Sequence, residues 1–226
     1  MTFWQKLFTK QAEQPEFVKQ YLQGLEKAFE PHMPISKIRF VVIDTETNGL
    51  DPKKAELLSF GGIGVQASGI RVADSLEMTA LAPEALLSED VAVHGLMRKD
   101  VQQGLASDQL VKKLISFIDR SVLVAHHAAF DLAILNATIK KHYHFKIKNP
   151  VLDTAYLAKR LEHGVALNEF VKAEDYSLDK LCERYGIAKD DRHTAAGDAL
   201  ITAELLLVLL SQAQKSGIHT FSELLK

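Results

Sequence analysis

The stretch Phe40-Val-Val-Ile-Asp-Thr-Glu-Thr-Asn-Gly49 decides the fold of this 226-residue chain. Its first four residues are apolar and mostly β-branched, which is typical of a buried strand. Asp44 and Glu46 follow two residues apart, so an extended backbone places both carboxylates on one face. Like charges held that close repel each other, and a cation between them relieves the repulsion. The stretch therefore predicts a strand that ends in a site for a hard metal ion, and a solvated turn is the alternative interpretation.

The composition limits the class of protein. Lys and Arg number 27 against 29 Asp and Glu, so the net charge is 27 − 29 = −2. This excludes a generally basic nucleic-acid binder and leaves only a local patch or bound metals for such contacts. The lone cysteine, Cys182, excludes an internal disulfide and a cysteine-based zinc site. With no signal-peptide pattern and no run of about 18 apolar residues, we expect a cytoplasmic protein that contacts no membrane.

We expect residues 1–36 to form an N-terminal helical extension and residues 37–226 to form the main domain. The spacing of Phe17, Tyr21, Leu25 and Ala28 predicts a helix over residues 16–30 that ends before Pro31. We expect this extension to pack on the domain, and a protein partner or a membrane surface is the alternative.

The main domain reads as an α/β protein. Three strands in succession predict an antiparallel meander over residues 38–46, 57–65 and 70–81. A short apolar strand at residues 121–125 follows a helix at 107–120, which indicates a parallel crossover. Four further helices are predicted at residues 128–141, 152–161, 177–185 and 195–214. The last helix should begin at a Thr194 cap and bury one stripe, made of Leu200, Ala203, Leu206, Leu207 and Leu210.

Two further acids begin predicted helices. Asp131 and Asp198 each lie in a first helical turn, where the helix dipole favours a carboxylate. His193 precedes Asp198 by five residues and belongs to the loop before the helix. A loop histidine beside a metal cluster is suited to taking a proton from water. Taken singly, each residue also fits a helix charge or a solvated loop.

Together these residues resemble a known family, the DEDD superfamily of 3′-to-5′ exonucleases. The resemblance is to the DnaQ-like branch with a histidine in its last motif, which includes the proofreading exonuclease of the DNA polymerase III epsilon subunit. Asp44-Thr-Glu46 is similar to the first motif, His126-x-Ala-x-Phe130-Asp131 to the second and His193-x4-Asp198 to the third. Three supporting segments match as well: residues 93–96, 152–154 and 178–186.

The resemblance implies that residues 37–226 form an exonuclease domain with an RNase H-like fold, a mixed five-stranded sheet flanked by helices. It also implies two divalent ions, Mg²⁺ or Mn²⁺, held among Asp44, Glu46, Asp131 and Asp198. In this scheme Asp44 bridges the ions, Glu46 and Asp198 complete one site, and Asp131 supports the other. His193 deprotonates the attacking water. Oxygen ligands without cysteine select these hard ions over zinc, which agrees with the scheme.

The resemblance also assigns a pocket for the terminal nucleotide. Thr47, Leu50, His94 and Phe130 match the lining positions in the family, although packing or turn chemistry explains each of them as well. One position departs from the pattern, because His127 stands where the family commonly has Asn. The departure puts the geometry of that loop and the substrate preference in doubt, but not the activity.

The predicted function is a two-metal exonuclease that acts on 3′ ends of single-stranded DNA and releases nucleoside 5′-monophosphates. The alternatives are cleavage of short RNA, a proofreading subunit of a DNA polymerase, and a non-catalytic nucleic-acid-binding module. Only about a dozen residues follow the last helix, which argues against the proofreading subunit, and the intact acid set argues against the non-catalytic module. Clustered carboxylates without metal are also expected to repel, so neutralising Asp44 or Asp198 should not destabilise the metal-free protein.

A basic segment, Lys140-Lys-His-Tyr-His-Phe-Lys-Ile-Lys148, contains four lysines and no acid. It is suited to following a phosphate backbone, and a solvated face after a helix end is an equal interpretation.

Overall fold

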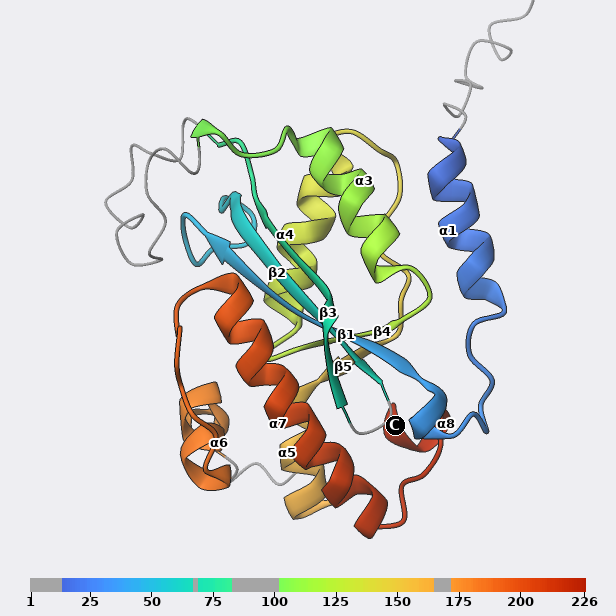
Figure 1. Cartoon of the computed structure of the whole chain (residues 1–226), viewed down its shortest axis with the longest axis vertical. Helices are drawn as coiled ribbons and strands as arrows, with labels where there is room; N and C mark the ends of the chain where they lie inside the picture. The colour runs from blue at the N-terminus through green and yellow to red at the C-terminus, as the bar shows by residue number, and fades with distance from the viewer. Residues whose placement is uncertain (1–13, 67–68, 83–101, 165–171) are drawn as a thin grey trace, which may run out of the picture.

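A five-stranded mixed sheet forms the centre of the computed structural model, which describes residues 14–66, 69–82, 102–164 and 172–226 (Figure 1). The strands lie in the order β3-β2-β1-β4-β5. Their bounds are β1 Arg39–Thr47, β2 Leu57–Gln66, β3 Gly69–Thr79, β4 Val122–Ala125 and β5 Val151–Asp153. β1 pairs antiparallel with β2, and β2 with β3, whereas β1–β4 and β4–β5 are parallel. The predicted meander and parallel crossover are therefore confirmed, and β1 is central.

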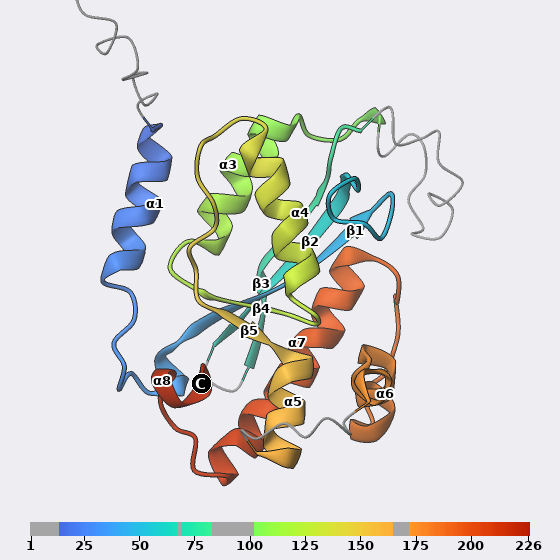
Figure 2. The ribbon, with the colours of Figure 1, turned by 180° about the vertical axis from the view of Figure 1, so that it is seen from behind.

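Helices cover both faces of this sheet (Figures 1 and 2). Successive side chains of β1 point to opposite faces of the sheet, and both faces are buried, so they pack into two different core clusters. Phe40 and Val42 belong to a core cluster with helices α5 (Thr154–His163), α6 (Leu178–Tyr185) and α7 (Ala195–Lys215). Val41 and Ile43 belong to the opposite cluster, under α3 (Ser107–Ile118) and α4 (Ala129–Lys140).

The fifth strand, β5, lies where the sequence pattern predicts the start of a helix at residue 152. Val151–Asp153 instead pairs in parallel with β4, and α5 begins only at Thr154. The Asp153 side chain accepts hydrogen bonds from the backbone N–H groups of Ala155 and Tyr156, so it caps the helix and ends the strand. A three-residue strand is too short to show a periodicity of its own.

The predicted stripe of the last helix is too narrow and partly misplaced. Ala203, Leu206 and Leu210 are buried, but Leu200 is 40% exposed. α7 is also buried on other sides, because it lies between β1 and β2 on one side and α5 and α6 on the other. Among the described helices, α7 alone is long and apolar enough to cross a membrane by length and composition. Most of its apolar stretch is buried inside the protein, as in the core helix of a folded domain.

The N-terminal helix α1 (Glu16–Glu26) ends four residues earlier than predicted. Phe29 leaves the helical path and stacks on Phe221, with ring centroids 5.0 Å apart. Phe221 begins the last helix, α8 (Phe221–Leu224). A short 3-10 turn, η2 (Ile35–Lys37), then leads into β1, and Ile35 N–H donates to the carbonyl of His219. A second 3-10 turn, η5 (Ala173–Tyr176), precedes α6.

Candidate active site

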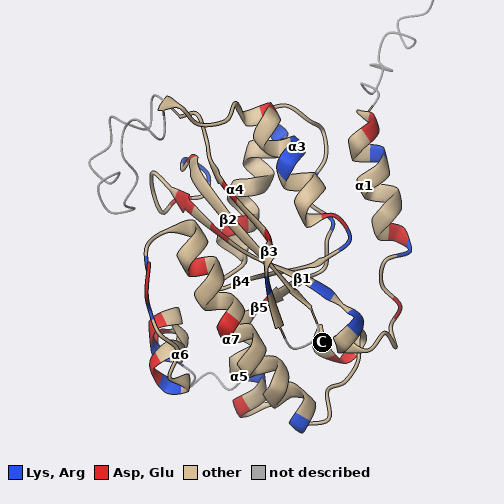
Figure 3. Cartoon of the chain, viewed as in Figure 1, with Lys and Arg blue, Asp and Glu red and all other residues tan. Residues whose placement is uncertain are grey.

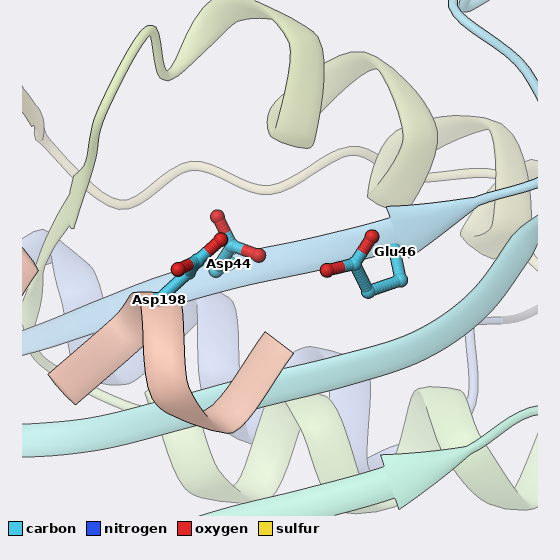
Figure 4. A group of neighbouring side chains, drawn as sticks. All are labelled: Asp44, Glu46 and Asp198. Carbon is cyan, nitrogen blue, oxygen red and sulfur yellow. The ribbon is translucent and has the colours of Figure 1, made fainter. Parts of the chain in front are cut away.

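The two acids of the opening stretch lie on β1 and face α7. Asp44 and Glu46 share one side of the strand with Phe40 and Val42, because residues two apart face the same way. Glu46 is only 7% exposed and Asp44 is partly exposed. Oxygen atoms of Asp44, Glu46 and Asp198 all lie within 4.8 Å of one another (Figure 4). The structure thus brings three of the four predicted metal ligands to one point.

Asp198 reaches this point because the N-terminus of α7 approaches the sheet closely. Thr194 caps the helix, and its hydroxyl accepts a hydrogen bond from the backbone N–H of Gly197. The helix start lies against Gly61 of β2, which pairs with Asp44 across the ladder. A Cβ atom on Gly61 would lie 2.2 Å from the carbonyl oxygen of Ala195. Gly61 therefore sets the distance between α7 and Asp44.

Asp131 lies in the first turn of α4, on the other side of β1. Thr45 points to that side, and its hydroxyl donates a 2.7 Å hydrogen bond to Oδ1 of Asp131. Asp131 is 4% exposed and close enough to Asp44 for their charges to interact strongly. Thr45 was not among the predicted site residues, although its position between the two acids identifies it as the residue that faces Asp131.

The electrostatics of the cluster disfavour full ionisation in the metal-free protein. Burial first, and then the carboxylates of Asp131, Asp198 and Glu46, raise the pKa of Asp44 well above its usual value. Burial, followed by repulsion from Asp198, raises the pKa of Glu46 to about 7. Burial also raises the pKa of Asp131 to about 7, against the lowering effect of the hydrogen bond from Thr45.

Arg192 is a site residue that is absent from the predicted set. Its guanidinium pairs with Oδ1 of Asp198 and also with Asp179 of α6, at 3.1 Å. The side chain of Arg192 is 18% exposed and that of Asp198 10%. Asp198 therefore has a protein cation beside it. The available signal was the position of Arg192, directly before the predicted base His193.

His193 lies in the turn before α7, exposed to solvent, as its loop position predicted. Its backbone is left-handed, with φ 64°, and Asp191 has φ 56°. The turn packs against the first turn of the helix, since a Cβ on Gly197 would lie 2.1 Å from the carbonyl oxygen of Asp191. His193 lowers the pKa of Glu46, which places the imidazole beside the acid cluster.

Comparisons with known proteins agree with this geometry. Residues 41–206 match the RNase T exonuclease family. The chain belongs to the exonuclease family. A DNA polymerase III subunit epsilon-like protein of Rhodobacter capsulatus is 36% identical over 199 residues, which cover 85% of this chain and 26% of that protein. The PolC-type DNA polymerase III of Thermotoga maritima is 29% identical over 83% of this chain and 13% of the polymerase. The exonuclease chain thus spans about a quarter or less of these relatives.

Solved structures show the same fold. Escherichia coli Exonuclease I in complex with a dT13 oligonucleotide superposes with a TM-score of 0.64 at 14% identity, over 80% of this chain and 43% of that one. Cell-death related nuclease 4 superposes with a TM-score of 0.62, also at 14% identity, over 80% of this chain and 66% of that one. The predicted resemblance, the RNase H-like sheet and the class of enzyme are confirmed.

The predicted nucleotide pocket of this exonuclease is only partly described. Thr47 is buried, and its hydroxyl donates to the carbonyl of Gly49, which shapes the turn after β1. Leu50 follows in that turn and is 92% exposed. Phe130 is half-buried in the first turn of α4. His94 lies outside the described residues. The lining roles of all four residues stay predictions.

His127 adopts the left-handed conformation, with φ 61°, in the turn between β4 and α4. Asn, Asp and His are the non-glycine residues enriched in that region. A histidine is therefore compatible with the backbone that this turn requires. The Asp153 carboxylate also anchors the turn, by accepting a hydrogen bond from the N–H of Ala128 at 2.9 Å.

The acid cluster is chemically suited to divalent cations. Its three nearest groups are carboxylates, and burial followed by repulsion between neighbouring carboxylates raises the pKa values of Asp44 and Glu46. Hard oxygen donors of this kind bind Mg²⁺ and Mn²⁺. Arg192 supplies one positive charge to the cluster through its pair with Asp198, and the pKa values of Asp44 and Glu46 stay raised in its presence.

Proposed function

We propose that this chain is a two-metal 3′-to-5′ exonuclease that hydrolyses single-stranded DNA to nucleoside 5′-monophosphates. The observation that carries the proposal is the meeting of Asp44, Glu46 and Asp198 within 4.8 Å, with Asp131 interacting with Asp44 from the other side. Acids on both sides of one central strand suit two neighbouring ions. When bound, Mg²⁺ or Mn²⁺ ions supply charge neutralisation and hold the attacking and leaving oxygens of a phosphoryl transfer.

The residues of the chain have distinct proposed roles. Asp44 lies between the other acids and is the shared ligand, Glu46 and Asp198 serve one ion, and Asp131 serves the other. Thr45 orients Asp131 through its hydrogen bond. The exposed His193 imidazole has room to accept a proton from the attacking water and to pass it to solvent.

The substrate end is held by the turn after β1 and by α4 in this proposal. Leu50 projects into solvent from the turn that follows the strand of Asp44 and Glu46, and an exposed apolar side chain suits contact with a terminal base. Phe130 precedes Asp131 in the first turn of α4, and Thr47 fixes the turn that carries Leu50. Together with His94, these side chains bind the 3′-terminal nucleotide. Nothing in these contacts reads the sugar, so short RNA remains the alternative substrate.

Proofreading is a second candidate function, favoured by the similarity to DNA polymerase III proteins. A primer with a mismatched 3′ end frays into a single strand, whereas a matched primer does not. Faster removal of the mismatched nucleotide by the isolated chain would support this role. Equal rates on both primers would argue for a general single-strand enzyme. The cytoplasmic location stays a prediction.

The direction and the metal requirement test the main proposal. DNA and RNA strands labelled at the 5′ end should shorten one nucleotide at a time with Mg²⁺ or Mn²⁺ and remain intact in EDTA. The products should be 5′-monophosphates, identified by mass. Degradation in excess EDTA, or release of the 5′ label as the first product, would contradict the proposal.

The proposed base is tested by comparing His193→Ala with Asp44→Ala. Loss of a positioned acid–base group lowers kcat by roughly 10²–10⁴-fold. His193→Ala should show such a loss and still bind two Mn²⁺ ions in calorimetry. Asp44→Ala should lose activity and the normal metal stoichiometry together. If His193→Ala abolishes Mn²⁺ binding as Asp44→Ala does, the histidine is a ligand and the assignment of the base is wrong.

A further inference from the structure

A groove of about 450 Å³ lies between α1 and the basic segment after α4. Its walls include Leu22 from α1 and Tyr143 and Phe145 from the segment, and its cations are Lys140, Lys146 and Lys148. We call it the lysine groove. In both views of the ribbon the segment runs between α1 and the α3–α4 pair (Figures 1 and 2).

The charge of the lysine groove is unbalanced. No acid lines it, and among the described residues its three lysines have no ion-pair partner. All three are exposed. The adjacent Lys141, by contrast, pairs with Glu56 at 2.9 Å and lines a different cavity. Elsewhere on the helices, charges of both signs are interspersed (Figure 3). Three unpaired cations in a chain of net charge −2 make this groove a local site for anions.

The aromatic wall of the groove is held rigidly by α1. Phe17 contacts Tyr143 edge to face, with centroids 5.2 Å apart, and Tyr21 packs against Phe145 at 6.1 Å. The Tyr21 hydroxyl donates to Asn149 at 2.6 Å and accepts from the backbone N–H of Lys148 at 2.9 Å. The lysines therefore project from a fixed backbone, so binding an anion here costs little ordering of the chain.

The groove lies at the opposite end of α4 from the acid cluster. Asp131 is in the first turn of α4 and Lys140 is its last residue. At 1.5 Å per residue the helix separates them by about 14 Å. This is the length of about four nucleotides at the ~3.4 Å spacing of a stacked strand. A strand whose 3′ end lies at the acid cluster reaches the groove only if it is longer than that.

We propose that the lysine groove binds the phosphate backbone of the substrate strand upstream of its 3′ end. The inference rests on the proposed exonuclease function and adds a second contact to the same substrate. Nucleic acid is favoured as the occupant because a chain of phosphates matches three spaced lysines, and because the aromatic side chains beside them suit bases of any sequence. The groove thus holds long strands in place while nucleotides are removed at the acid cluster.

The test compares two triple variants of the full chain. One carries Lys140→Gln, Lys146→Gln and Lys148→Gln. The control carries Lys113→Gln, Lys172→Gln and Lys215→Gln, which removes the same charge from exposed lysines outside the groove. Binding of a fluorescent 12-nucleotide oligo(dT) is measured by anisotropy in EDTA, as a function of salt. The groove variant should bind about tenfold more weakly at 0.1 M salt, and its salt slope should fall by about 2, since each phosphate contact on a single strand contributes ~0.7. The control should match the wild type.

Hydrolysis of short and long substrates distinguishes a defect in the lysine groove from a defect in the acid cluster. With Mn²⁺, the p-nitrophenyl ester of thymidine 5′-monophosphate and a dinucleotide test only the cluster, and the groove variant should hydrolyse both at the wild-type rate. Its kcat/KM on the 12-mer should fall about tenfold. If neither the wild type nor either variant hydrolyses any of these substrates, the exonuclease proposal fails. The anisotropy measurements still show whether the lysine groove binds the strand.

Three results would overturn the inference. The first is equal weakening of 12-mer binding in the control variant, which would reflect net charge alone. The second is unchanged 12-mer binding in the groove variant and in Lys146→Glu, which places a repelling charge in the groove. The third is a wild-type dimer in sedimentation that the groove variant loses while strand binding persists, which would make the groove a contact between copies of this chain.

Discussion

At the scale of single residues, the acids of the cluster differ in their neighbours. Asp198 has a partner, because Arg192 pairs with it and is itself held by Asp179. Asp44 lies among the other three acids, and burial first and then their repulsion raise its pKa. The sequence alone predicts that neutralising Asp44 or Asp198 does not destabilise the metal-free protein. We keep this prediction for Asp44, but for Asp198 we now expect a loss of stability.

Asparagine substitutions test this difference. In EDTA at pH 7.5, Asp44→Asn should raise the melting temperature, since it removes like-charge repulsion. Asp198→Asn should lower stability by about 1–3 kcal/mol, because it leaves a mostly buried guanidinium with one partner instead of two. Denaturant unfolding of both variants measures the effect. Equal stabilisation by the two substitutions would show that the Arg192 pair contributes nothing.

The pH dependence of metal-free stability follows from Glu46. Its folded pKa of about 7 lies above the ordinary value of about 4.5, so the folded state binds the proton more tightly. The stability that this group contributes is complete below about pH 4.5 and is lost as the pH rises to 7. Glu46→Gln should therefore match the wild type near pH 4.5 and exceed it at pH 8, by on the order of 3 kcal/mol. Unfolding in urea with EDTA at both pH values measures this, and saturating Mn²⁺ should reverse the order. A difference independent of pH would contradict the raised pKa.

At the scale of elements, the site depends on how closely α7 approaches the sheet. β1 carries Asp44, β2 carries Gly61 directly opposite, and the first turn of α7 lies against that glycine. The sequence shows the glycine only as a weak point in a strand pattern. The tertiary contact shows that it creates the space for the helix start, and hence for Asp198.

Gly61→Ala should displace α7 from the cluster. The added Cβ would lie 2.2 Å from a backbone carbonyl that belongs to the helix start, which a side-chain rotation does not relieve. We expect a stability loss of about 1–3 kcal/mol and a fall in kcat of roughly 10²-fold, because Asp198 moves relative to Asp44. Gly69→Ala is the matched control, since a Cβ there meets nothing within 4 Å. Wild-type activity of Gly61→Ala would show that the close approach is not required.

At the scale of the whole molecule, α1 is packed into the main domain. Val18 and Tyr21 are buried, and Tyr21 belongs to the core cluster under α3 and α4. This agrees with the expected packing of the extension. The segment after α1 meets the C-terminal helix α8 through the stacked rings of Phe29 and Phe221. Arg160 of α5 holds the same helix by donating hydrogen bonds to the carbonyls of Glu223 and Leu224. The acid cluster lies apart from these contacts.

A chain truncated to residues 35–226 should separate stability from chemistry. Loss of α1 uncovers buried apolar surface, so the melting temperature should fall by several degrees. Hydrolysis of a dinucleotide at 20 °C should remain within a few-fold of wild type, because every proposed ligand lies after residue 38. Tyr21→Phe is the milder companion and should cost about 1 kcal/mol through its lost hydrogen bonds. A folded but inactive truncated chain would place the extension in the active site.

The sequence by itself determined the central strand, the four acids and the order in which they appear. These are local properties, since the alternation of Phe40 to Glu46 and the helix starts at Asp131 and Asp198 depend only on neighbouring residues. The cap at Thr194 is local too, and the structure confirms it. The family motifs joined these pieces into one expected fold.

Only the tertiary structure decided how the pieces meet. β5 exists because β4 provides a partner for three residues that show no strand pattern of their own. The burial of α7 follows from layers on more than one side, so a single stripe underestimates it. Arg192, Thr45 and Gly61 acquire their roles from residues far away in the sequence. Such contacts depend on the approach of whole elements, which hydrophobic packing sets and which no local pattern encodes.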